Sequence, residues 1–302
     1  MGPHLIDVSA ILRVASTAAR KLERVLHSEL GLADKFLYVL DEVLDRVGMG
    51  RGGPRRYRLG TGETIALRPA TTDRRVFDEV FLEQVYGSFV ALLPTGAGPL
   101  MLVDLGANIG LSTIYLANKL CLESVVAVEP DADNYRMLQQ NLAGNVQPET
   151  HLLEAFVGAE RGFAEILDAG YGAWGLRIGA AAASGIPVLP LIDVISDPRG
   201  GSARGGVILK CDIEGGERNI FPGIRDWDTH VRFIILELHT EYFAVPRLIE
   251  ALETSHYEWS IHGQVAAGAV LAVLGLERGV RKPETVQSGR DSRNHSSRAA
   301  AV

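Results

Sequence analysis

The chain has 302 residues, of which 47% are hydrophobic and 22% charged. This composition is typical of a globular protein and unlike that of a disordered or collagen-like chain. The formal net charge of −7 argues against binding of nucleic acid through overall charge. Glycine accounts for 33 residues, well above the usual ~7%, which indicates tight turns or backbone that approaches a ligand closely.

The sequence contains two cysteines, Cys121 and Cys211, too few for a disulfide framework or a four-cysteine zinc site. We expect both to be buried free thiols. No segment approaches the ~20 apolar residues of a membrane span, and the N-terminus lacks the pattern of a secretory signal. These observations predict a soluble, cytoplasmic protein without a membrane-spanning segment.

Apolar residues recur at three- and four-residue spacing through residues 5–47, which predicts helices broken at Gly31. The glycines and Pro54 of residues 48–58 are typical of a linker. Its arginines are either solvated or form a clamp for an anionic substrate: Arg51, Arg55, Arg56 and Arg58. Residues 1–60 are thus predicted to be a helical N-terminal extension that could act as a cap, a lid or the surface of a homo-oligomer.

Residues 61–98 form the predicted lead-in to the main domain. Four aromatic residues in it have roughly helical spacing and are expected in the core rather than as a platform for an acceptor: Phe77, Phe81, Tyr86 and Phe89.

From residue 99 onward, short runs of Val, Ile and Leu alternate with helical patterns. Strands are predicted at residues 100–105, 124–129, 151–157, 206–213 and 231–239. Apolar strands separated by helices predict an α/β fold with a doubly wound, mostly parallel, Rossmann-like sheet. A final pair, residues 257–262 and 269–274, has the spacing of an antiparallel edge hairpin.

The main domain is predicted to span residues 99–277. Within it, residues 158–185 contain Tyr171 and Trp174 and read as either an active-site lid or a mobile surface loop. The tail at 278–302 is polar, basic and free of aromatic residues, so we expect it to be disordered.

A glycine-rich loop follows the first strand of this domain. Asp104 lies at the strand end, Gly106 and Gly110 allow close backbone approach, and a helical pattern begins at Leu111. A dinucleotide-binding loop would have glycine where Asn108 stands, and Asp104 would repel its pyrophosphate. The same carboxylate would attract a cationic amino or sulfonium group. The loop therefore favours S-adenosylmethionine over NAD.

Glu129 ends the next strand, 19 residues after Gly110. This is close to the ~20-residue spacing of an acid that holds ribose hydroxyls, in either cofactor. A structural role before Pro130 is the alternative, although Asp131 and Asn134 are better placed to cap the following helix.

Six segments in fixed order resemble the FkbM-type methyltransferases, a family of class I S-adenosylmethionine-dependent enzymes. They read VDLGANIGLSTIYLA, AVEPDADNYRMLQQNL, EAFVGAERGFAEI, LIDVI, LKCDIEGGERNIFPG and FIILELH. The resemblance covers about residues 80–240, and its most specific part is Lys210-x-Asp212-x-Glu214-Gly215. The family usually has Lys-Ile-Asp-Val-Glu-Gly-Ala-Glu there, so this chain departs at Cys211, Ile213 and Gly216.

The resemblance implies a class I methyltransferase domain that transfers a methyl group, usually to a hydroxyl oxygen of a small molecule or sugar. The predicted set that binds S-adenosyl-L-methionine is Asp104, Gly106, Ala107, Asn108, Gly110, Glu129, Pro130, Ala155, Phe156 and Asp212.

The predicted catalytic residues lie at two strand ends. Lys210, Asp212 and Glu214 alternate, so they share one face, with Asp212 at the carboxyl edge. Lys210 and Glu214 could instead form structural ion pairs. The next strand ends with Glu237 and His239; the imidazole could deprotonate an acceptor hydroxyl or be a hydrogen-bonded surface group.

Three questions stay open at the level of sequence. A divalent cation on Asp212, Glu237 and His239 is an alternative, although we expect no metal. The acceptor could be a natural-product hydroxyl, a sugar or a lipid-linked glycan. The chain could also be an NAD-dependent oxidoreductase, or a cofactor-binding module without activity.

Overall fold

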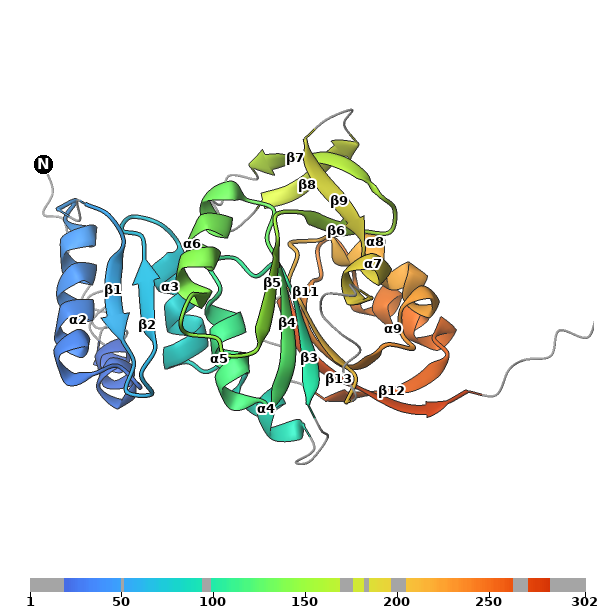
Figure 1. The fold of residues 1–302 in the computed structure, drawn as a ribbon, viewed down its shortest axis with the longest axis horizontal. Coiled ribbons are helices and arrows are strands. Elements are labelled where there is room, and N and C mark those ends of the chain that lie inside the picture. Colours follow the sequence, from blue (N-terminus) through green and yellow to red (C-terminus); the bar gives the residue numbers. More distant parts are fainter. Residues whose placement is uncertain are drawn as a thin grey trace, which may run out of the picture.

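The computed structural model describes residues 19–49, 52–93, 99–168, 176–181, 185–196, 205–262 and 271–282. Its central feature is a seven-stranded sheet in the order β12-β13-β11-β10-β3-β4-β5 (Figure 1). The strands are β3 (Leu100–Leu105), β4 (Leu122–Val128), β5 (Glu149–Leu153), β10 (Val207–Cys211), β11 (Val231–His239), β12 (Tyr257–His262) and β13 (Leu271–Arg281). The five strands from β11 to β5 are parallel, and β13 runs antiparallel to both β11 and β12.

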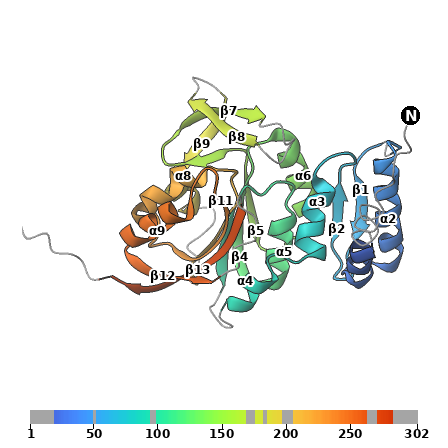
Figure 2. The same ribbon diagram turned by 180° about the vertical axis from the view of Figure 1, so that it is seen from behind.

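Helices cover both faces of this sheet (Figures 1 and 2). One face packs against α4 (Gly87–Leu92), α5 (Leu111–Lys119) and α6 (Ala132–Leu142). The other packs against α7 (Leu191–Ile195), α8 (Glu217–Ile220), the 3-10 helix η3 (Phe221–Asp226) and α9 (Val245–Thr254). Alternate strand residues supply the two cores because successive side chains point to opposite faces. The structure confirms the doubly wound α/β fold.

A second, four-stranded sheet begins where β5 ends (Figure 1). Its order is β6-β9-β7-β8, with β6 (Phe156–Gly158), β7 (Gly162–Asp168), β8 (Leu176–Ala181) and β9 (Ile186–Pro190). The prediction of one strand over residues 151–157 is therefore wrong, because the chain changes sheets after Leu153. The lid or loop expected at 158–185 is instead largely strand in its described part, and Tyr171 and Trp174 lie outside the described residues.

The N-terminal extension combines helices with a small hairpin. Residues 19–27 are helical, and α2 (Leu32–Arg46) begins after Gly31. Strand β1 (Arg55–Arg58) pairs antiparallel with β2 (Thr64–Leu67), so residues 55–58 are not a linker, and the boundary predicted at residue 60 falls in the hairpin turn. The lead-in then forms α3 (Asp73–Phe77) and a five-residue π-helix, η1 (Asp78–Leu82).

A chain of aromatic rings joins this extension to the main domain. Tyr38 on α2 contacts Tyr57 on β1 and Phe77 on α3, with ring centroids 5.3 and 5.1 Å apart. Phe77 stacks on Phe81, which meets Tyr115 of α5 at 5.9 Å. The four lead-in aromatics are all buried, as predicted. The extension and the sheet therefore share one continuous core.

The C-terminal hairpin is confirmed as an antiparallel edge, but it is longer than predicted. Strand β13 continues to Arg281, and the Lys282 amide donates to the carbonyl of His256 at 2.8 Å. The start of the expected disordered tail is thus a strand, and residues 283–302 lie outside the described part of the chain.

Two further expectations concern the cysteines and the membrane. Cys211 is a buried free thiol as predicted, but Cys121 is exposed. Among the helices that the structure describes, none has the length and apolar character needed to cross a bilayer.

Gly106 sets the distance between the loop after β3 and the end of β10. Its φ is +72°, and a Cβ built there would lie 1.7 Å from the backbone oxygen of Asp212. Only glycine fits, because the obstacle is backbone rather than a flexible side chain.

We expect Gly106→Ala to lower the free energy of unfolding by at least about 2 kcal/mol more than Gly144→Ala. Gly144 has a similar φ of +79° with nothing within 4 Å of a built Cβ, so it controls for the left-handed backbone alone. Urea unfolding of both variants measures the difference. Equal losses would show that the close approach to Asp212 has no energetic consequence.

Candidate functional site

The predicted site residues converge on one edge of the main sheet. The glycine loop follows β3, Glu129 follows β4, Ala155 follows β5 and Asp212 follows β10, while His239 ends β11. These strands are neighbours in the sheet and run parallel. Their carboxyl ends therefore meet at the edge where ligands bind in open α/β sheets.

The glycine loop is anchored to β4 through its backbone. The amides of Gly106 and Ala107 donate to the carbonyl of Val128 at 3.0 and 2.9 Å. Asn108 has a φ of +51°, a conformation that asparagine tolerates better than most residues. Gly110 has a φ of +88° and precedes the first residue of α5. The loop thus folds back on the sheet and starts the helix as the sequence predicts.

Glu129 holds this loop against the start of α6. Its Oε2 accepts the Asn108 amide and its Oε1 accepts the Asp131 amide, both at 2.9 Å. Burial raises the pKa of Glu129 to about 7, although the two amide donors partly oppose this. Asp131, rather than Glu129, caps α6 by accepting from the amides of Asp133 and Asn134.

Asp104 is fully buried, and its oxygens are engaged within the protein. Oδ2 accepts from the hydroxyls of Ser112 and Thr113 at 2.8 and 2.7 Å. Oδ1 lies 3.1 Å from the ammonium of Lys210. In this structure Asp104 therefore contacts Ser112, Thr113 and Lys210 rather than solvent at the open edge, and a direct contact with a cofactor cation stays a prediction.

Lys210 bridges the glycine loop and the end of β10. Its Nζ donates to the carbonyl of Gly106 at 2.9 Å and lies 3.5 Å from Asp212 as well as beside Asp104. The side chain is 2% exposed. Burial lowers the pKa of Lys210, but Asp104 and the other nearby anions outweigh this and raise it well above its usual value. The structure thus forms the ion pairs that were the structural alternative for this lysine.

The turn after β10 brings two glutamates to His239. Glu214 adopts a φ of +50° and Gly215 a φ of +89°, so the chain reverses before α8 begins at Glu217. His239 Nδ1 then lies 2.9 Å from Glu217 Oε1. Its Nε2 lies 3.2 Å from Glu214 Oε2 and 3.9 Å from Asp212 Oδ1.

This environment determines the protonation of His239. Burial lowers the pKa of the imidazole, but the hydrogen bonds to Glu214 and Glu217 outweigh it and raise the pKa to about 11. An imidazolium donates hydrogen bonds and cannot accept a proton. This arrangement favours the hydrogen-bonded histidine, the alternative that the sequence left open, over a general base.

Three residues near Asp212 and His239 were missed in the sequence analysis or given too small a role. Glu237 interacts electrostatically with Asp212, and burial together with that carboxylate raises the pKa of Glu237 to about 8. Tyr86, only 5% exposed, has charged neighbours that include Lys210 and Glu237. Burial and nearby carboxylates that include Asp212 raise the pKa of Glu79, which lies on the π-helix η1. No local pattern marks Tyr86 or Glu79, because long-range packing of the lead-in brings them here.

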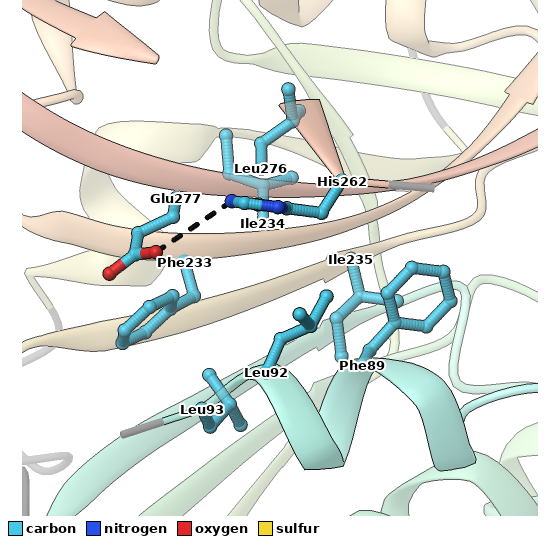
Figure 3. Close-up of a pocket in the computed structure, with 9 residues that line it drawn as sticks. All are labelled: Phe89, Leu92, Leu93, Phe233, Ile234, Ile235, His262, Leu276 and Glu277. Atoms are coloured by element: carbon cyan, nitrogen blue, oxygen red, sulfur yellow. Dashed lines mark ion pairs between the residues drawn. The ribbon is translucent and has the colours of Figure 1, made fainter. Parts of the chain in front are cut away.

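An apolar pocket lies elsewhere, between α4 and the strands β11, β12 and β13 (Figure 3). Its polar members are His262 and Glu277, which are 3.8 Å apart. The β11 residues that line it are Phe233 to Ile235, in the first half of a strand whose carboxyl end is His239. It contains none of the predicted site residues.

We expect Lys210→Met to lower the free energy of unfolding by about 3–5 kcal/mol, because it leaves Asp104 as an uncompensated buried charge. The double variant Asp104→Asn/Lys210→Met removes both charges and keeps an acceptor for Ser112 and Thr113. Denaturant unfolding should show that the double variant regains much of the loss. A single variant within about 1 kcal/mol of wild type would contradict the pairing.

Comparison with known proteins places this geometry in a family. The model of the methyltransferase FkbM domain matches residues 104–260. A curated relative, the AMB antimetabolite synthetase AmbE of Pseudomonas aeruginosa, is 34% identical over 94 residues, which are 31% of this chain and 4% of the synthetase. The chain thus spans a small fraction of that relative.

Solved structures with a similar fold include methyltransferase FkbM from Methylobacillus flagellatus, at 20% identity and a TM-score of 0.40, covering 62% of this chain and 45% of that one. Another is TYW2 of M. jannaschii in complex with AdoMet, at 15% identity and a TM-score of 0.39, covering 77% of this chain and 89% of that one.

The domain match covers more than half of the chain and includes the glycine loop, the Lys210–Asp212 segment and His239. The chain therefore belongs to the FkbM methyltransferase family.

Proposed function

We propose that the protein is an S-adenosylmethionine-dependent O-methyltransferase that acts on a hydroxyl of a small molecule, natural product or sugar. The observation that carries this proposal is the placement of a glycine loop beside a strongly anionic strand edge. A cationic sulfonium cofactor is favoured there by charge, whereas a pyrophosphate would be repelled.

The cofactor would lie over the loop between β3 and β5. Gly106, Ala107, Asn108 and Gly110 allow the backbone to approach it. Glu129 would accept hydrogen bonds from the ribose hydroxyls. The remaining predicted cofactor-binding residues follow the ends of β4 and β5: Pro130, Ala155 and Phe156, the last of which begins β6. Asp104 supports this binding indirectly by holding Lys210 and thereby the Gly106 carbonyl.

The acceptor would lie on the β10–β11 side. In methyl transfer the acceptor oxygen bonds to the methyl carbon, the carbon–sulfur bond breaks, sulfur leaves as a neutral thioether and the hydroxyl proton departs. Asp212 is the residue we propose to accept that proton, since its side chain is 19% exposed at the edge. Most of the catalytic effect would come from aligning the two reactants and excluding water.

Calorimetric titration of the full chain with S-adenosylmethionine, and separately with NAD, tests the cofactor. We expect binding of S-adenosylmethionine and none of NAD, because the anionic edge disfavours a pyrophosphate. Binding of NAD alone would overturn the proposal in favour of an oxidoreductase. If the cofactor binds, methyl transfer to a panel of hydroxyl acceptors distinguishes an enzyme from a binding module.

The raised pKa of Glu129 makes cofactor affinity depend on pH. The carboxylate accepts hydrogen bonds from ribose hydroxyls better than the neutral acid does, and Glu129 ionises around pH 7. We therefore expect affinity for S-adenosylmethionine to rise by up to about tenfold from pH 6 to pH 8. In Glu129→Gln this rise should shrink, and any part that remains belongs to other groups such as Glu237.

Glu123→Gln provides the matched control, because Glu123 is exposed at the opposite end of β4. It should keep the wild-type pH dependence in the same calorimetric series. Equal pH dependence in wild type and Glu129→Gln would contradict a ribose-binding role for Glu129.

Two other expectations stay predictions: the cytoplasmic location and homo-oligomerisation through the N-terminal helices. The second is supported by large apolar side chains that α2 exposes at helical spacing: Leu32, Phe36, Leu40 and Val43.

A further inference from the structure

We infer that Asp212, Glu214 and His239 form a binding site for a divalent cation. One donor atom from each of these residues lies within 4.8 Å of the other two. The residues come from two adjacent strand ends, β10 and β11, and the set differs from the one expected from sequence because Glu214 replaces Glu237.

The spacing suits an octahedral ion. Neighbouring ligands at about 2.1 Å from such an ion lie about 3.0 Å apart, and opposite ligands about 4.2 Å apart. The distances from His239 Nε2 to Glu214 and Asp212 are 3.2 and 3.9 Å, which fall within that span. Nε2 carries a single proton, so it can donate to only one of the two carboxylates. A cation between them would displace that proton, bind His239 as a neutral imidazole and contact both carboxylates at once.

The charge around the cluster also points to a missing cation. Within the described residues, five carboxylates from β3, β11 and the segment that runs from β10 into α8 gather here: Asp104, Asp212, Glu214, Glu217 and Glu237. The cationic groups among them are Lys210 and His239, while Glu79 on η1 pairs with Arg75. Lys210 is shared between Asp104, Asp212 and the Gly106 carbonyl, so the two cationic groups leave the five carboxylates without a full counter-charge. Buried or half-buried anions of this kind need a cationic partner.

One buried polar atom next to His239 lacks a partner, and this is independent of the donor spacing. Glu217 is fully buried, and its Oε2 has no hydrogen-bond partner in the part of the chain described. An anionic oxygen left unpaired in the interior adds to the negative charge that a bound cation would offset.

Glu217 supports the site from behind. Its Oε1 lies 2.9 Å from His239 Nδ1, which directs Nε2 toward Glu214 and Asp212. A carboxylate behind a ligating histidine is the usual way in which a metal site fixes the orientation of its imidazole. Two carboxylates with one imidazole favour Mn²⁺, since carboxylates suit Mg²⁺, Ca²⁺ and Mn²⁺ while imidazole suits the transition metals.

The site itself does not depend on the proposed function, but its role does. In an O-methyltransferase, a cation here would hold the acceptor hydroxyl and lower its pKa, and Asp212 would then act as a ligand of the cation rather than as the proton acceptor proposed above.

Titration of the full chain with Mn²⁺, followed by the electron paramagnetic resonance signal of the free aqua ion, tests the site without any activity assay. We expect one Mn²⁺ per chain, with affinity lowered at least about tenfold in Glu214→Gln and also lowered in Glu217→Gln. Glu250→Gln is the matched control, because Glu250 is 59% exposed and pairs with Arg247 on α9; it should bind as wild type does. Circular dichroism confirms that each variant is folded.

Absence of Mn²⁺ binding at millimolar concentration, or equal binding by Glu214→Gln and wild type, would overturn the inference. Displacement of Mn²⁺ by saturating S-adenosylmethionine would also overturn it, since the anionic cluster would then serve the cofactor cation. Mn²⁺ binding without S-adenosylmethionine binding would uphold the site and refute the proposed function. Methyl transfer by protein that binds no Mn²⁺ in the titration would uphold the proposed function and refute the site.

Discussion

The buried ammonium of Lys210 connects the parts of the molecule on which the site depends. It joins the Asp104 carboxylate on β3, the Gly106 carbonyl in the glycine loop and the Asp212 carboxylate after β10. A lysine that is 2% exposed needs such partners, because an unpaired charge is very costly in the interior. The same contacts hold the loop at the distance that the missing Cβ of Gly106 permits. The ion pairs of Lys210 and the close packing at Gly106 therefore fix the same arrangement of the glycine loop against the end of β10.

Outside this pair, the strand edge retains an excess of negative charge. Asp212, Glu214 and Glu217 surround His239, which links the ends of β10 and β11. Burial raises the pKa of Glu237 and the neighbouring Asp212 carboxylate raises it further, while the carboxylates around His239 outweigh the effect of burial and raise its pKa. The excess also makes the edge suited to cationic ligands. The sulfonium cofactor and the divalent cation that we propose are two ligands of this kind, at adjacent positions.

The lead-in and the N-terminal extension complete the site from outside the matched domain. The aromatic chain from Tyr38 to Tyr115 fixes α3 and the π-helix η1 against the main sheet. That packing delivers Tyr86 and Glu79 to the surroundings of Asp212. A π-helix is rare and frequently occurs at functional sites. The extension is thus part of the same folded unit as the sheet, and residues of the lead-in contribute to the electrostatics of the edge.

The sequence by itself determined that strands alternate with helices in a mostly parallel sheet, where the glycine loop lies, the helix after it and the convergence of Glu129, Asp212 and His239 on one edge. These features follow from local periodicity and from the rule that parallel strands share a carboxyl edge. Only the tertiary structure decided which side chains meet. Asp104 was expected to face a ligand and is instead buried against Lys210, and His239, left open as a base or a hydrogen-bonded group, is held between carboxylates that raise its pKa. Ionisation and burial depend on neighbours distant in the chain, such as Glu217 and Tyr86, so no local pattern encodes them.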